Sequence, residues 1–111
     1  MNLSGTWHIY EMRMWDEDYL NREVQAYIHI DENGGGDFQF GLVSCGLHGK
    51  VVNYTGQQRF EFTFSGSDEY EPTNGSGWIA LKGKDNIEGE FRFHLSDSSA
   101  FLAHKAKERS L

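Results

Sequence analysis

Alternation of apolar and polar residues runs through most of the chain. In the stretch 60–64, Phe60, Phe62 and Phe64 share one parity, while Glu61 and Thr63 share the other. This period of two is typical of a strand with one buried face. The same alternation recurs along 26–31, 37–42 and 88–93, and no stretch of a dozen residues has a comparable helical period. The pattern therefore predicts an all-β protein.

Turn residues separate the alternating runs. Asn33-Gly34 is a strong hairpin signal, and Lys84-Asp85-Asn86 predicts a second tight turn. Ser44-Cys45-Gly46 is expected to divide the stretch 37–54 into two strands, and 65–77 is expected to form the one long loop. The strands predicted in this way span 6–12, 25–30, 37–43, 47–54, 58–65, 77–82, 86–94 and 99–105. Between the first two strands, we expect Asp16 to cap a short helical turn.

Short connections make each predicted strand antiparallel to the next, because a parallel crossover needs a longer segment. Eight strands with one apolar face each close most simply into a single antiparallel up-and-down barrel, which leaves no open edge. A two-sheet sandwich is the alternative. With 111 residues and no visible linker or repeat, the chain is expected to form one domain over residues 1–111.

The composition limits the classes of partner. Seventeen acidic and ten basic residues give a net charge of −7, which argues against a nucleic-acid partner. The apolar runs are far shorter than the ~18 residues of a membrane helix, and no signal-peptide opening is visible. The single cysteine, Cys45, allows no internal disulfide and suits a reducing compartment. We therefore expect a cytoplasmic protein, either a monomer or a homodimer, without a membrane partner.

The opening Gly5-Thr6-Trp7 resembles the Gly-x-Trp start of lipocalins and streptavidin-like barrels. This resemblance implies a calycin-like barrel whose tryptophan closes one end beneath a basic residue of the last strand. In the predicted topology, Lys105 or Lys107 is placed to cover Trp7. The chain also resembles short bacterial single-domain proteins through Glu11-Met12-x-x-Trp15-Asp16 and His94-x-x-Asp97-x-Ser99. That second resemblance implies no activity.

All eight phenylalanines fall in predicted strands, mostly at the inward parity, with Trp7 and Trp78 beside them. An eight-stranded barrel either fills itself with side chains or holds one small ligand. Because the chain is short, we expect a largely filled barrel. Any pocket is then shallow and lies near one rim.

Glu11 and Cys45 are candidates for chemistry. Glu11 shares the parity of Trp7 and Ile9, so a regular strand would place it inward near a barrel mouth, where a desolvated carboxylate makes a general acid or a ligand anchor. A strand that twists or bulges and leaves Glu11 in water is the simpler interpretation. Cys45 has His48 three residues on, but nothing else supports a nucleophilic pair, and an inert thiol is the simpler interpretation.

Metal and cofactor sites have no support in the spacing of the residues. The histidines at 8, 29, 48, 94 and 104 follow no zinc-ligand pattern. The acidic runs 16–18 and 68–71 do not match an EF-hand loop, and Gly34-Gly35-Gly36 has no following helix that would bind phosphate. We expect neither a metal nor a cofactor.

The odd-numbered connections of an up-and-down barrel meet at one rim. The residues expected there are Trp15, Asp16, Asp18 and Tyr19 from the first connection, Cys45 from the third, Asp68, Glu69, Tyr70 and Glu71 from the fifth, and His94, Ser96 and Asp97 from the seventh. Binding residues tend to lie on loops held by a rigid scaffold, and an acidic cleft attracts cations. The alternative is acidity that serves solubility alone.

The function that these features favour is a non-enzymatic binding or interaction module. Its acidic, aromatic rim, with Glu11 nearby, would accept a cationic small molecule or a basic segment of a partner protein. One alternative is a lipocalin-like carrier of a small apolar ligand. Another is a small barrel isomerase or cyclase with Glu11 or Asp18 as base and His94 as its partner, which requires two of these groups within hydrogen-bond reach in a cleft.

Overall fold

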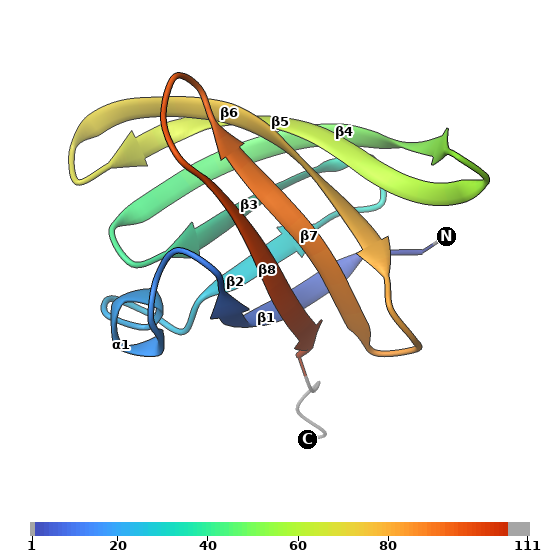
Figure 1. Ribbon diagram of the computed structural model, residues 1–111, viewed down its shortest axis with the longest axis horizontal. Helices are drawn as coiled ribbons and strands as arrows, with labels where there is room; N and C mark the ends of the chain where they lie inside the picture. The colour runs from blue at the N-terminus through green and yellow to red at the C-terminus, as the bar shows by residue number, and fades with distance from the viewer. Residues whose placement is uncertain (1, 107–111) are drawn as a thin grey trace.

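A computed structural model describes residues 2–106, in which eight antiparallel strands close into one barrel in chain order (Figure 1). The strands are β1 (Gly5–Met12), β2 (Tyr27–Ile30), β3 (Gly35–Phe40), β4 (Val43–Tyr54), β5 (Gln57–Asp68), β6 (Glu71–Leu81), β7 (Asn86–Phe93) and β8 (Ser98–Lys105). The barrel closes where β8 pairs with β1, from Trp7 opposite Lys105 to Met12 opposite Phe101. The predicted up-and-down barrel is confirmed.

Two connections, β3–β4 and β5–β6, differ most from the sequence prediction. Ser44-Cys45-Gly46 does not form a turn, because these residues pair with Asp37–Gln39 inside β4. The turn lies at Gly41-Leu42, where Gly41 has φ +56°, a conformation that favours glycine. A Cβ at Gly41 would also lie 2.2 Å from the ring of Tyr19. The packed ring, which the local sequence does not reveal, fixes the turn there.

The predicted long loop 65–77 is also wrong. Ser65 pairs with Asn74 and Asp68 with Glu71, so β5 and β6 form one long hairpin with a tight turn at Glu69-Tyr70. Pro72 and the glycines suggested a loop. The strand pairing tolerates Pro72 because β6 has an open edge at this point, and a proline there interrupts no hydrogen bond between strands.

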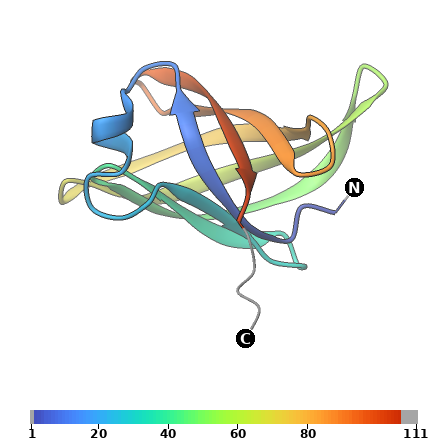
Figure 2. The ribbon, with the colours of Figure 1, turned by 90° about the horizontal axis from the view of Figure 1, so that it is seen from below.

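The short helix α1 (Glu17–Leu20) follows β1, as predicted. The side chain of Asp16 accepts a hydrogen bond of 3.0 Å from the Tyr19 N–H, which confirms its role as the N-cap. Leu20 is buried, and its carbonyl accepts a bond of 2.9 Å from the Gly41 N–H. The helix is thereby held against the end of the barrel that carries the β3–β4 turn (Figure 2).

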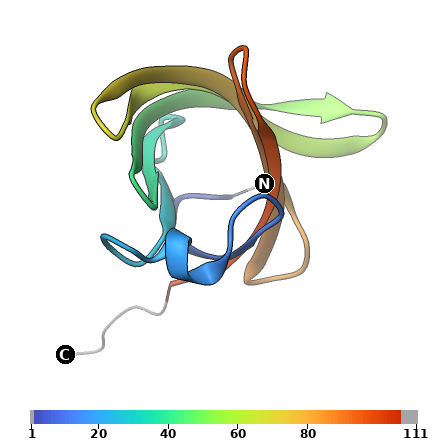
Figure 3. The same cartoon turned by 60° about the vertical axis from the view of Figure 1, so that its left-hand side comes forward.

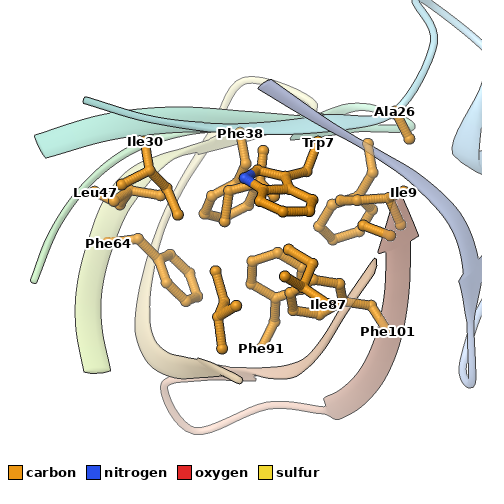
Figure 4. Close-up of a cluster of buried hydrophobic side chains, with 14 of the residues drawn as sticks. Trp7, Ile9, Ala26, Ile30, Phe38, Leu47, Phe64, Ile87, Phe91 and Phe101 are labelled. Carbon is orange, nitrogen blue, oxygen red and sulfur yellow. The ribbon is translucent and has the colours of Figure 1, made fainter. Parts of the chain in front are cut away.

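Aromatic side chains fill the interior (Figure 4). Seven phenylalanines are buried, and the half-buried Phe93 packs against them, so all eight belong to one core, as predicted. Trp7 is 1% exposed, and its Nε1 donates a 2.9 Å bond to the Leu3 carbonyl. The Lys105 Nζ lies 5.7 Å from the centroid of the Trp7 ring, which confirms that Lys105 covers it. Lys107 lies outside the described residues.

Inward-facing glycines lie opposite several of these rings. Phe62 pairs across the sheet with Gly77, and Phe64 pairs with Gly75. A Cβ built on Gly77 would lie 2.6 Å from Phe62 Cζ and 2.4 Å from the Glu90 carbonyl oxygen. The glycines therefore leave the space that the large rings occupy, an alternation of small and large residues that a packed barrel needs.

We expect Gly77→Ala to lower the free energy of unfolding by about 1–3 kcal/mol, because the added methyl must displace Phe62 or the backbone of β7. Gly46→Ala is the matched control. It adds the same methyl group on the outer face of β4, where the nearest atom to the new Cβ is 3.9 Å away. Urea denaturation of both variants checks this. A Gly77→Ala variant as stable as Gly46→Ala would contradict the packing.

Candidate functional site

The odd-numbered connections lie at one end of the barrel, because successive strands are antiparallel (Figure 3). We call residues 13–26, 41–42, 68–71 and 94–97 the acidic rim. The predicted rim residues Trp15, Asp18, Asp68, His94 and Asp97 all belong to it, and so do Glu69 and Tyr70. Residues up to 82 positions apart in the sequence are thus brought to one end.

Hydrogen bonds tie the connections of the acidic rim to one another. The Glu69 N–H donates to the Leu42 carbonyl at 3.1 Å, and the Leu42 N–H donates to the Tyr19 hydroxyl at 3.4 Å. The His94 N–H donates to the Asn74 carbonyl at 2.8 Å, which joins the last connection to β6. The rim is therefore built on a rigid frame.

The aromatic side chains of the first connection pack inward. Trp15 is half-buried, with its ring centroid 5.2 Å from that of Phe40 and 6.1 Å from that of Phe93. Tyr19 is also half-buried and stacks on Trp15 at 6.1 Å. Trp15 thus covers the core at this end, as Trp7 does at the other. These two rim residues support the site and offer little free surface to a ligand.

Two other rim side chains are almost fully exposed. Tyr70, at the β5–β6 turn, is 98% exposed, and Leu95, at the β7–β8 turn, is 94% exposed. Both are in the left-handed region, with φ of 72° and 57°, which is uncommon for residues other than glycine and costs roughly 1–3 kcal/mol. Leu95 was not among the rim residues predicted from the sequence. The available signal was an apolar residue within the polar turn 94–98.

Carboxylates surround the two exposed tips. The acidic rim contains eight acidic residues and two basic ones, and all eight carboxylate side chains are exposed. The acidic residues are Asp16, Glu17, Asp18, Glu23, Asp68, Glu69, Glu71 and Asp97. Among residues 2–106, the ion pairs are Lys82–Glu88 and Arg92–Glu90, so none of the rim carboxylates is paired. Most of the net charge of −7 is therefore gathered at one end.

Glu11 does not point into the barrel, because β1 bulges and leaves it in water, as the simpler interpretation of the sequence expected. Ile9 pairs with Ala103, whereas Glu11 pairs with Leu102, so Tyr10 is an extra residue in a β-bulge. A shift of one residue exchanges the two faces of a strand. Met12 is buried in consequence, and Glu11 is exposed on the outer wall. There it lines an external groove of about 600 Å³ with Trp78 and Leu102.

Cys45 is not at the rim either. It lies within β4, is 3% exposed and faces the core, because the true turn is at Gly41-Leu42. His48 is exposed and has the opposite parity, so the structure does not pair the two side chains. Burial, with a smaller contribution from the negative charge of Asp68, raises the pKa of the Cys45 thiol from 9.0 to about 11. A protonated, buried thiol is a poor nucleophile.

We expect Cys45 to react with iodoacetamide at pH 8 at least about 100-fold more slowly in the native protein than in denaturant, since a pKa two units higher leaves about 100-fold less thiolate. The control carries Cys45→Ala with Ser44→Cys, which moves the thiol to the exposed face of β4. That variant should react almost as fast folded as unfolded. Equal rates for Cys45 in the two states would contradict the assignment.

The three groups of the enzyme alternative are not brought together. His94 precedes the start of β8 at Ser98, whereas Glu11 pairs with Leu102, four residues further along. Four strand residues span roughly 13 Å, which is beyond hydrogen-bond reach. Within the described part of the chain, no side-chain hydrogen bond joins any two of Glu11, Asp18 and His94.

Within residues 2–106, no group of three or more His, Cys, Asp or Glu side chains is placed to hold a metal ion. The same residues contain no helix with the length and apolar character needed to cross a membrane. Surface hollows lie along the outer wall and toward the opposite end of the barrel, and neither Tyr70 nor Leu95 lines them. Comparison of the chain with protein-family models, curated proteins and solved structures finds no match.

Proposed function

We propose that this protein is a non-enzymatic interaction module whose acidic rim binds a basic segment of a partner protein. The observation that carries the proposal is the pair of exposed tips, Tyr70 and Leu95, held in left-handed backbone among unpaired carboxylates. Exposed apolar side chains on strained turns contribute nothing to the core, and strain of this kind concentrates at binding sites. Aromatic anchors surrounded by charge are typical of protein interfaces.

The spacing of the tips favours an extended partner over a small cation. The β7–β8 turn is bonded to Asn74 of β6, and Tyr70 lies four residues before Asn74, in the β5–β6 turn. That separation corresponds to roughly 13 Å along the hairpin. A compact cation is shorter than this separation, whereas an extended peptide segment spans it. The partner chemistry is therefore a segment with basic residues for the carboxylates and apolar residues for Tyr70 and Leu95.

The carrier alternative has less support. A carrier of the lipocalin type needs a cavity inside the barrel, but the space between the walls is occupied by the aromatic core around Phe91. The charge of −7 also favours a basic protein segment over nucleic acid. A cytoplasmic location is part of the same proposal, because the single cysteine is a buried free thiol and suits a reducing compartment.

We expect the double substitution Asp68→Asn and Glu69→Gln to weaken binding of a short synthetic peptide that alternates arginine and leucine by about threefold to tenfold. Stability should change little, because exposed charges contribute little to folding. Fluorescence anisotropy of the labelled peptide measures the affinity. The matched control, Glu32→Gln with Asp85→Asn, removes the same charge from exposed positions at the opposite end.

The control should bind the peptide within about twofold of the native protein, because the charges it removes lie further away than a Debye length of ~8 Å. Tyr70→Ser and Leu95→Ser should each weaken binding at constant net charge. If the control and the rim variant lose affinity equally, the attraction is a property of net charge alone and the proposed site is wrong.

A further inference from the structure

The β4–β5 hairpin projects beyond the rest of the barrel. The last residue pair between β3 and β4 is Gly35 with His48, and the Gly49 N–H donates one further bond of 2.8 Å to the Gly34 carbonyl. β4 nevertheless continues, paired with β5, as far as Tyr54 opposite Gln57. Figure 1 shows this hairpin extending past its neighbours. Along 50–54, the outer edge of β4 has no strand beside it among the described residues.

The open edge carries backbone groups that are ready to pair. In an antiparallel strand, successive residues direct their N–H and C=O groups to opposite sides. Gly49 bonds toward β3, so Val51 and Asn53 direct their groups to the same, open side. An edge of this kind is a template for another strand.

The barrel has a second projecting edge, on β6, which is protected from pairing with another strand, whereas the edge of β4 is not. β6 extends past β7 over 71–74, where Pro72 has the parity of Asn74 and so presents no N–H at the open edge. The edge of β4 has no proline, and the segment 51–58 contains no charged residue. Val51 and Tyr54 are 43% and 52% exposed. The edge is thus uncharged and partly apolar over 51–54, and an edge of this kind is one that proteins pair or block.

We propose that this edge is the interface for a second copy of the chain, which adds its own β4 in antiparallel orientation. Pairing about a twofold axis at Asn53 places Asn53 opposite Asn53, and it keeps the incoming Thr55-Gly56 turn clear of Gly34, which is bonded to Gly49. The two Asn53 residues exchange two backbone hydrogen bonds. The same surface patch serves both copies, as a closed twofold dimer requires.

Charge favours a second copy in this position. The hairpin 49–60 carries Lys50 and Arg59 and no acidic residue, so all seventeen acidic residues lie elsewhere in the chain. The hairpin 49–60 therefore has a net charge of +2, although its tip is uncharged. In the proposed register, this hairpin lies end to end with the exposed turn Asp31-Glu32 of the other copy, since that turn lies beside Gly49. A hollow of about 250 Å³, lined by Leu3, Asp31, Val51 and Phe60 among others, faces the incoming strand.

Sedimentation equilibrium over a wide concentration range tests the proposal. The native chain should approach twice the monomer mass as concentration rises. Val51→Lys, which places a charge on the edge, should raise the dissociation constant at least about tenfold. Val24→Lys is the matched control, because Val24 is 44% exposed and lies in the loop before β2. It makes the same change of charge and should dimerise like the native chain.

Two further measurements locate the interface. Hydrogen exchange at the Asn53 amide should slow as concentration rises, while exchange in the acidic rim stays constant. Asn53→Pro removes an N–H that is not bonded to β5, so the barrel should fold and remain monomeric. A native chain that stays monomeric at the highest concentration overturns the proposal. So does a dimer that survives both Val51→Lys and Asn53→Pro.

Discussion

Trp7→Ala should lower the free energy of unfolding by about 3–5 kcal/mol, the usual cost of removing a fully buried aromatic side chain. The indole is 1% exposed, fills one end of the barrel and donates to the Leu3 carbonyl. The loss of apolar burial is compounded by the cavity that remains, because the sheet around it cannot collapse freely. Urea denaturation followed by circular dichroism measures the change.

Two control variants separate the contribution of apolar burial from that of the hydrogen bond and of the position in the barrel. Trp7→Phe keeps most of the apolar burial and removes the bond to Leu3, so it should cost less than Trp7→Ala. Trp15→Ala removes the same side chain from the other end, where it is half-buried, and should also cost less. A Trp7→Ala variant within about 1 kcal/mol of the native protein would refute the closed-end plug.

Phe91→Ala should be comparably severe, at about 3–5 kcal/mol. Phe91 is 0% exposed, and its ring centroid lies 4.5 Å from those of both Phe38 and Phe101. Further contacts to Phe40, Phe62 and Phe64 make it the ring that joins the two walls of the barrel. Truncation at this point removes packing from every side.

Phe93→Ala is the matched control, two residues further along β7. Phe93 has the same parity but is only half-buried, so its truncation should cost clearly less than that of Phe91. Thermal and urea unfolding of the two variants give the comparison. Equal losses would mean that the core is not centred on Phe91.

The fold was predictable because alternation is a local signal. Phe60, Phe62 and Phe64 lie on the inner face that their parity predicted, and the strand order followed from short connections. The bulge at Tyr10 was not predictable, since it depends on how β1 pairs with β8, some ninety residues away. That single extra residue turns Glu11 outward, whereas the parity of a regular strand would have placed it inward.

Turn positions were harder to predict, because a glycine can either form a turn or lie within a strand opposite a large side chain. Gly46 and Gly66 lie within paired strands, whereas Gly41 forms a turn beneath the Tyr19 ring. Several inward glycines exist to make room for rings, a reason that becomes visible only when the cross-strand partner is known. Local sequence therefore suggested a turn at Ser44–Gly46 and a loop at 65–77 that do not occur.

The strand topology predicted which residues lie at the acidic rim, but it did not predict which of their side chains are packed and which are exposed. Strand parity placed Asp68, Glu69 and Asp97 at one end irrespective of small errors at the boundaries. Whether an aromatic side chain packs or protrudes depends on the space left by the core. Trp15 fits against Phe40, whereas Tyr70 and Leu95, at the hairpin tips, have no core within reach.

The central claim is that the acidic rim is the binding face. Nuclear magnetic resonance titration of the isotopically labelled protein with the alternating arginine–leucine peptide tests it most directly. We predict that amide shift changes concentrate at 16–18, 68–71 and 94–97 and that they shrink as salt screens the carboxylates. Changes centred on the external groove beside Trp78 or on the opposite end, or changes insensitive to salt, would contradict the claim.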